Sequence, residues 1–242
     1  MATRAPRRSA QQRRRLILQS AQAVFAASSY AKVGTADLAK AAGISEPALY
    51  RYFRSKKDLF IATIRASGVR LLEIWERLAM EVVDPLDVIR AIGIGYYDHL
   101  HSRSPVMKLL FQAISEADDP NIRRALHDNF ASFIRFFQEN IEEGKRRGLI
   151  RQDVDTNIAA WRFMSMGLAL DLINLLGFAK QIDRSAVEEW QMLYLSSIQE
   201  RPDGVKAEGR FAAEGVDRSM VENWRELYLE AVGEGSLGTD QT

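Results

Sequence analysis

Residues 35–60, TADLAKAAGISEPALYRYFRSKKDLF, predict two short helices joined by a glycine turn. We expect Thr35 to be the N-cap of the first helix, because a hydroxyl there accepts a hydrogen bond from a free backbone N–H. Gly43 supplies the turn, since glycine adopts backbone conformations that other residues avoid. Ser45 is the expected N-cap of the second helix, and Pro47 falls in its first turn, where a missing N–H does no harm. The stretch therefore predicts a helix-turn-helix.

The third helix of this region opens on two lysines. Ser55 is its expected N-cap, which places Lys56 and Lys57 at the positive end of the helix dipole. Each such charge costs roughly 0.3–1 kcal/mol, whereas a phosphate bound at this helix end would be favoured by both lysines and by the free N–H groups. Taken alone, two lysines are equally consistent with ordinary solvated surface. Directly after a helix-turn-helix, they favour contact with DNA phosphates.

The net charge of +1 is unevenly distributed along the chain. Residues 1–60 hold twelve Lys and Arg against three Asp and Glu, a net of +9, and the remaining residues hold 21 against 29, a net of −8. A basic end on an acidic body is typical of a nucleic-acid-binding domain joined to a domain that does not bind nucleic acid.

The first fifteen residues contain six arginines and no acid. Residues 1–10 lack apolar periodicity, so we expect a basic arm that is disordered when free. Such an arm suits a loose phosphate contact or insertion into a minor groove, and Arg13 and Arg14 at its end are expected DNA contacts. A transit peptide is the alternative, but the helix-turn-helix begins too soon after it. Without an apolar signal-peptide core, we expect a cytoplasmic protein.

Helical periodicity continues through the rest of the chain, and no convincing alternating strand pattern appears, so the sequence predicts an all-α fold. We expect a three-helix DNA-binding domain at 11–60 and a larger helical ligand-binding and dimerisation domain at 61–200. The last helix of the first domain continues into the second, to about 79–84. The expected helical runs, several of them opening at a proline, are 11–28, 86–101, 106–117, 121–147, 156–178 and 184–200.

Two of these runs are strongly apolar. The run 121–147 carries an apolar stripe at three- and four-residue steps, formed by Leu126, Phe130, Phe133, Phe137 and Ile141. Phe163–Ala179 is almost wholly apolar, interrupted by a serine, Asp171 and an asparagine. It is too short and too polar at its centre to span a membrane, so we expect this helix to be buried between its own fold and a partner subunit.

One helix is duplicated in the sequence. DRSAVEEWQMLYL at 183–195 recurs as DRSMVENWRELYL at 217–229, with nine of thirteen positions identical. We expect 201–242 to form a flexible link, an extra helix at about 216–232 and a disordered tail. The extra helix either packs near the dimer interface or is a tolerated addition.

The segment from Arg15 to Thr63 closely resembles the DNA-binding domain of the TetR/AcrR family of bacterial transcriptional regulators. The matching residues are Ala21 and Phe25, then Thr35, Leu38-Ala39, Ala42-Gly43-Ile44-Ser45, Leu49-Tyr50-Arg51-Tyr52-Phe53 and Ser55-Lys56-Lys57-Asp58-Leu59. The resemblance covers about fifty residues, within which several constrained positions agree at fixed spacing, whereas the rest of the chain agrees only in being helical and of suitable length.

This resemblance implies a homodimer that binds a double-stranded DNA operator and is released by a small, apolar effector. It implies phosphate contacts by Thr35, Tyr52 and Lys56 and a recognition helix formed by Ser45, Glu46, Pro47, Ala48, Tyr50 and Arg51. Arg51 is the best candidate for a base contact, because arginine donates two hydrogen bonds to guanine. Glu46 is a departure: it would repel phosphate but could accept a hydrogen bond from a cytosine amino group.

The effector is expected to bind among aromatic and methionine side chains of the larger domain. The candidates are Trp75, Tyr96, Tyr97, Met107, Phe111, Trp161, Phe163, Met164 and Met166. For each of them a purely structural place in the core is the simpler interpretation, and about one in three is expected to touch a ligand.

Nothing in the sequence indicates an enzyme or a cofactor. The zero cysteine count excludes disulfides and thiol chemistry, and no phosphate loop or nucleophile–histidine–acid pattern is present. We expect no metal, although His99 or His101 with Glu116, Asp118 or Asp119 could form a site. The serious alternative is a DNA-binding activator or architectural factor without an inducer. A dimeric scaffold whose basic end binds acidic partners would leave Thr35, Tyr52 and Lys56 unexplained.

Overall fold

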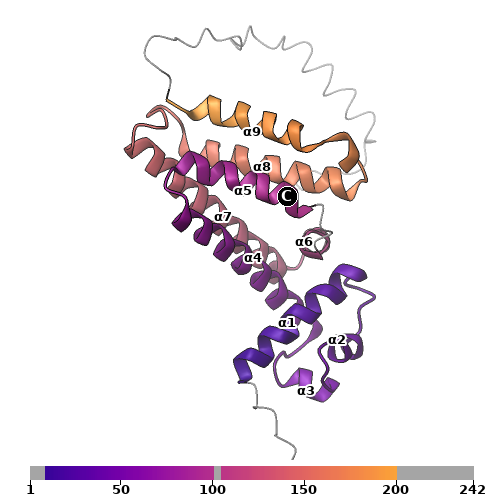
Figure 1. Ribbon diagram of the computed structural model, residues 1–242. Coiled ribbons are helices and arrows are strands. Elements are labelled where there is room, and N and C mark those ends of the chain that lie inside the picture. The colour runs from indigo at the N-terminus through magenta and orange to yellow at the C-terminus, as the bar shows by residue number, and fades with distance from the viewer. Residues whose placement is uncertain (1–8, 101–104, 201–242) are drawn as a thin grey trace, which may run out of the picture. The chain divides into compact units, whose positions relative to one another are not determined.

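The computed structural model describes residues 9–100 and 105–200, and these are helical with no strand except one isolated bridge between Ile150 and Gln199. The prediction of an all-α protein is confirmed. The helices are α1 (Ala10–Ala27), α2 (Thr35–Ala41), α3 (Glu46–Tyr50), α4 (Lys56–Glu81), α5 (Pro85–Leu100), α6 (Pro105–Ser115), α7 (Pro120–Arg146), α8 (Thr156–Leu175), a 3-10 turn η1 (Ala179–Gln181) and α9 (Arg184–Ile198). In Figure 1, α1, α2 and α3 gather at one end of α4, and α5, α8 and α9 lie toward its other end.

The first four helices share one aromatic core. Phe25 of α1 and Phe60 of α4 are fully buried and meet edge to face with their ring centroids 4.8 Å apart. Leu38 of α2 and Leu49 of α3 are buried against them, as the apolar spacing of the sequence predicts. Gly43 turns the chain between α2 and α3 with φ of +63°, a left-handed conformation that a residue with a Cβ adopts only at a cost.

The helix caps agree with the sequence at α3 and α4 and differ at α2. The Ser45 and Ser55 hydroxyls accept hydrogen bonds from the backbone N–H groups of Ala48 (3.4 Å) and Asp58 (3.0 Å). The prediction that Thr35 is an N-cap is wrong. Gly34 precedes α2, and its N–H donates to Oδ2 of Asp37 at 3.3 Å, which leaves the Thr35 hydroxyl available to a different partner.

α7 is the central helix of the larger part of the chain and packs against α4, α5 and α8. Its apolar stripe is buried, with Phe137 and Ile141 at 1% exposure or less. Trp75 of α4 lies 5.2 Å from the Phe137 ring, and Phe163 of α8 lies 4.5 Å from it on another side. α4 itself runs through residue 60, so the two domains expected from the sequence have this helix in common.

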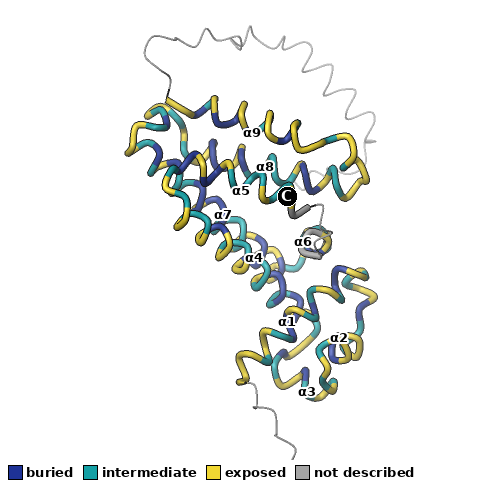
Figure 2. Tube along the Cα trace, in the orientation of Figure 1, coloured by how far each residue is buried: buried dark blue, intermediate teal, exposed yellow. Residues whose placement is uncertain are grey.

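α5 and α9 approach closely because α5 has a glycine at the contact. A Cβ at Gly93 would lie 1.5 Å from Nε2 of Gln191, a buried side chain of α9. The Gln191 amide, with its donor facing Arg90 O (3.2 Å) and its acceptor facing Ile94 N (3.1 Å), bonds to the backbone of α5. On the opposite side of α9 the residues are exposed (Figure 2).

Several expectations fall on residues that the structure does not describe. These are the arginine arm at residues 1–8, His101, and the whole of 201–242 with the second copy of the duplicated helix. At the N-terminal end, α1 begins at Ala10, because Ser9 and Gln12 form a reciprocal capping box. Among the described helices, α8 has the length and apolar composition of a membrane span, a test that a core helix also passes.

Candidate functional site

The surface around α3 carries the residues expected to contact DNA. Ser45, Pro47 and Arg51 are exposed, and Tyr50 is 48% exposed. The recognition helix is shorter than expected, because α3 ends at Tyr50. Arg51 is the C-cap residue and Tyr52 follows it, half-buried, so neither lies within the helix. In the part of the chain that the structure describes, the Arg51 guanidinium has no hydrogen-bond or ion-pair partner, which leaves all its donors available.

Three of the expected DNA contacts are hydrogen-bonded to one another. The Tyr50 hydroxyl donates to Thr35 Oγ1 at 3.4 Å, and the Thr35 hydroxyl donates to a carboxylate oxygen of Glu46. This chain of hydrogen bonds joins α2 to α3 across the turn. It gives Glu46 a structural partner that the sequence did not indicate, since the two residues are eleven positions apart.

Replacing Glu46 with glutamine is expected to raise the affinity for DNA of any sequence. The glutamine amide oxygen would still accept from the Thr35 hydroxyl, while a half-buried negative charge on the expected DNA-binding surface is removed. The change corresponds to about 0.2–1 kcal/mol, as for a surface charge pair. We expect a gain of roughly two- to fivefold for a random duplex, measured by fluorescence anisotropy at fixed salt. Glu76→Gln, an exposed acid on α4, is the matched control. Equal affinities of wild type and Glu46→Gln would remove Glu46 from the DNA-facing surface.

The basic residues beside α3 already have partners within the protein. Lys56 Nζ donates to Tyr30 O (3.0 Å) and Ala31 O (3.5 Å) and lies 4.5 Å from the centre of the Tyr30 ring. Lys57 Nζ forms an ion pair with Asp119 at 2.8 Å, which raises the pKa of Lys57 and lowers that of Asp119. The Arg14 guanidinium stacks 5.0 Å from the Phe53 ring, whereas Arg13 is half-buried.

A cavity of about 350 Å³ is lined mainly by residues of α4, α5, α7 and α8, with further residues from α6 and α9 and Gln22 of α1. This volume falls in the range of small-molecule sites, about 300–1,000 Å³. Its wall is mostly apolar and aromatic. The residues of α4 that line the cavity run from Ile64 to Trp75, so the cavity follows α4 for about three helical turns, roughly 16 Å.

The nine pocket candidates divide by helix face. Those that line the cavity are Trp75, Tyr96, Phe163, Met164 and Met166. Three others do not line it: Trp161 is 47% exposed on α8, the Tyr97 hydroxyl donates to Ile182 O at 3.3 Å, and Phe111 follows the lining residue Leu110 without being part of the wall. Each is one or two residues from a lining residue, and successive helical residues point about 100° apart. The side chain of Met107 lies outside the described residues.

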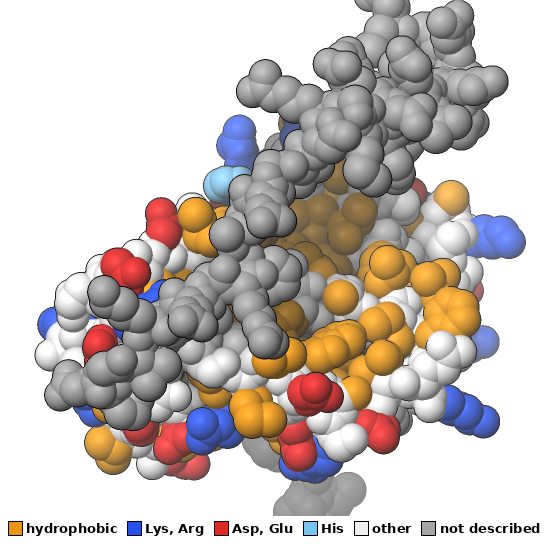
Figure 3. Space-filling model, turned by 90° about the horizontal axis from the view of Figure 1, so that it is seen from above, with side chains coloured by type: hydrophobic (Ala, Val, Ile, Leu, Met, Phe, Trp, Pro, Cys, Tyr) orange, Lys and Arg blue, Asp and Glu red, His pale blue; other side chains and the backbone are white. Residues whose placement is uncertain are grey.

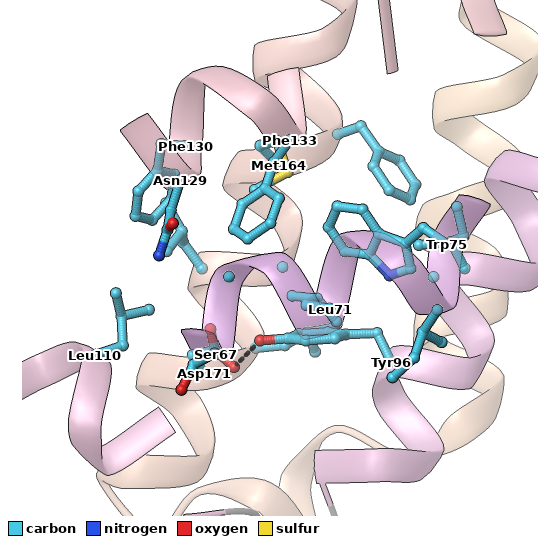
Figure 4. Close-up of a pocket in the computed structure, with 18 of the residues that line it drawn as sticks. Ser67, Leu71, Trp75, Tyr96, Leu110, Asn129, Phe130, Phe133, Met164 and Asp171 are labelled. Carbon is cyan, nitrogen blue, oxygen red and sulfur yellow. Dashed lines mark hydrogen bonds between the residues drawn. The ribbon is translucent and has the colours of Figure 1, made fainter. Parts of the chain in front are cut away.

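The wall also contains residues that the sequence pattern indicated only as core or as interruptions of an apolar run. Phe130, Phe133 and Phe137 belong to the apolar stripe of α7, and all three line the cavity. Figure 4 shows Phe130 and Phe133 there. Asn129 Nδ2 donates to Ile64 O at 2.9 Å and so joins α7 to α4 at the cavity wall. In the sequence Asp171 interrupts an apolar run, and this interruption is the one sequence feature that could have indicated a polar group in the cavity wall.

Asp171 is the one acidic residue in the described wall of the cavity, and it is 2% exposed. The Tyr96 hydroxyl donates to its Oδ1 at 2.6 Å (Figure 4). Burial raises the pKa of Asp171 from 3.8 to about 7, although the hydrogen bond from Tyr96 acts in the opposite direction. Burial also raises the pKa of Tyr96, and the Asp171 charge adds to this effect.

Asp171→Asn is expected to stabilise the protein at pH 8 but not at pH 4. Between pH 4 and 7 the unfolded state loses this proton while the folded state keeps it, so the carboxyl lowers the free energy of unfolding as the pH rises. A shift of about three pKa units corresponds to an upper limit of about 4 kcal/mol. Urea unfolding of the wild type and of Asp171→Asn at several pH values measures the difference in the free energy of unfolding. A stability difference that does not change with pH would contradict the assignment.

No group of three or more acidic or histidine side chains within the described residues is positioned to hold a metal ion. The side chains of His99 and His101 are not among those described.

Residues 17–63 match the family model described as bacterial regulatory proteins, tetR family. Over 101 residues the chain is 28% identical to the HTH-type transcriptional activator FasR of Mycolicibacterium smegmatis, an alignment that spans 42% of this chain and only 46% of that protein. Over 148 residues it is 27% identical to the HTH-type transcriptional repressor Rv1474c of Mycobacterium tuberculosis, spanning 60% of this chain and 73% of that one.

The fold is also found among solved structures. A TetR-family transcriptional regulator from Mesorhizobium loti superposes with a TM-score of 0.68 over 79% of this chain and 96% of the other, at 19% identity. At this identity the similarity concerns the fold alone. The family model covers the helix-turn-helix and the helix before it, and the structural match extends over 79% of the chain.

Proposed function

The chain belongs to the TetR family of bacterial transcriptional regulators, and we propose that it is a ligand-responsive repressor that binds a near-palindromic operator as a homodimer in the cytoplasm. The family consists of transcriptional regulators rather than enzymes. One feature carries the proposal: a single helix, α4, begins six positions after the end of α3 and has its middle in the wall of the cavity.

The exposed surface of α3 supports the DNA-binding part of the proposal. Ser45, Pro47 and Tyr50 present short or planar side chains that allow close approach to a major groove, and Arg51 supplies a long donor beside them. Contacts from Lys56 or Lys57 to phosphate require these ammonium groups to exchange or share their present partners. The two recognition helices of a dimer would enter grooves about 34–36 Å apart or somewhat more.

An exposed apolar face on α8 and α9 supports the homodimer. On α8 its residues are three, eleven and four positions apart, which places them on one side of the helix, and on α9 it has two adjacent residues. These residues, all at least 47% exposed, are Ile158, Trp161, Leu172, Leu176, Met192 and Leu193. Figure 3, which views the body from the α9 side, shows hydrophobic side chains gathered there. Two copies of one helix pair joined about a twofold axis would cover this face, as in four-helix bundles.

Besides the continuous α4 helix, two side-chain contacts connect the helices around the cavity to the DNA-binding helices. Gln112 of α6 donates to Phe25 O (2.6 Å) and Ser28 O (2.9 Å) at the end of α1, three residues from the lining residue Leu109. Lys57 at the start of α4 is paired with Asp119, the N-cap of α7. A ligand that favours one arrangement of α4 and α6 would thus change the position of α3, in proportion to its preference for that arrangement.

The sign of regulation is proposed as repression. One named relative is an activator and the other a repressor, so similarity supports both. Repression requires only that the dimer occupy a promoter, whereas activation requires a further contact with the transcription machinery. A promoter–reporter assay with and without the gene distinguishes the two: repression predicts higher expression when the protein is absent.

Selection of bound sequences from a random double-stranded DNA pool, with purified protein at physiological salt, tests the proposal. A palindromic consensus would support a dimeric, sequence-specific regulator. Binding without enrichment, lost on addition of salt, would mean that the basic end binds DNA only electrostatically and would overturn the proposal.

A further inference from the structure

The most unusual group in the cavity is a carboxylate with no cation beside it among the described residues. Asp171 has Tyr96 as its hydrogen-bond donor through Oδ1, and no Lys, Arg or His of the described chain contributes to its pKa. Arg70, the single basic residue in the wall within the described chain, is exposed at its edge. Above pH 7 Asp171 therefore contributes a negative charge to an apolar space, and no described positive charge beside it compensates for it.

Burial of this charge lowers the stability of the folded protein when no ligand is bound. A cation that binds beside Asp171 recovers part of that cost, because it replaces the lost hydration with a direct ion pair. A ligand carboxylate has the opposite effect, since two adjacent carboxylates do not both ionise and Asp171 would have to be protonated.

The remainder of the wall suits the apolar part of the same ligand. Figure 4 shows Asp171, Ser67 and Leu110 toward one end of the cavity and Trp75 toward the other. The Tyr96 and Phe133 rings lie between these ends, and Phe130 and Phe163 also line the cavity. Such aromatic rings attract a cation through their faces and bury a hydrocarbon chain.

We propose, as an extension of the proposed ligand response, that the cavity selects an elongated apolar amine, with its ammonium group at Asp171 and its apolar chain along α4 toward Trp75. The ion pair sets the orientation, and the aromatic wall contributes most of the buried area. This makes Asp171 the specificity-determining residue of the cavity.

Three probes with the same tail test the charge preference: decylamine, decanol and decanoate, each titrated into the full chain by calorimetry at pH 8. Removing one partner of a buried charge pair costs about 30-fold in affinity or more. We expect decylamine to bind at least about tenfold more tightly than the other two probes, and Asp171→Asn to lose about 30-fold for decylamine while keeping its affinity for decanol. Retained decanol binding shows that the variant cavity is intact.

Asp153→Asn, which removes one exposed charge outside the cavity, is the matched control and should bind all three probes as wild type does. Decylamine affinity should also fall as the pH drops through 7, because burial raises the pKa of Asp171 to about 7 and protonation removes the charge that pairs with the ammonium group. Tyr96 and Arg70 are the other titratable groups of the described wall. The inference would be overturned if decanoate bound more tightly than decylamine, or if Asp171→Asn bound decylamine as tightly as wild type does. Either result would leave the proposed ligand response in place. Failure of all three probes to bind would also overturn it, while operator selection tests DNA binding separately.

Discussion

Replacing Leu172 with glutamate is expected to convert the proposed dimer into a monomer and to lower operator affinity by about 10²- to 10⁴-fold. Leu172 lies in the exposed apolar face of α8 and α9 and is 47% exposed in the single chain, so the substitution leaves the fold of the protomer intact. In a twofold interface the change occurs twice and buries two carboxylates without partners, at several kcal/mol. The loss in operator affinity follows because each half-site would then bind alone, without the effective concentration that a dimer supplies.

Sedimentation velocity measures the association state, and anisotropy with the selected operator measures the affinity. Met80→Glu is the matched control, because Met80 is 81% exposed on α4, away from α8 and α9. This control should remain dimeric and bind the operator normally. A dimeric Leu172→Glu protein would place the interface elsewhere on the chain.

Most helix boundaries could be predicted from local signals. Pro85, Pro105 and Pro120 each occupy the first position of a helix, where a missing N–H is harmless. The run expected at 156–178 ends earlier, at Leu175, because Gly177 takes φ of +84° and reverses the chain. Apolar residues after a helix end continue the pattern but not the helix, so periodicity alone extends it too far.

The candidate sites depended on contacts between distant parts of the chain, and there the sequence was less informative. Tyr96 and Asp171 are 75 positions apart, and Thr35 and Glu46 are eleven apart. Periodicity places a residue on a helix face but does not indicate which neighbour that face meets. Thus Trp161 and Phe163 were equal candidates for the pocket, although only Phe163 lines the cavity.

Arg51→Ala is expected to reduce operator affinity by about 30-fold or more and to relax the base preference at one position of each half-site. A guanidinium that donates two hydrogen bonds to guanine contributes about 1–3 kcal/mol of discrimination, and a dimer loses this contact twice. Affinities for the selected operator, for operators with each guanine replaced, and for a random duplex separate base contacts from phosphate contacts. Arg54→Ala removes the same charge three residues further on and is the matched control. If both substitutions weaken binding equally on every sequence, Arg51 contacts phosphate, and the bases are read by the side chains at the start of α3.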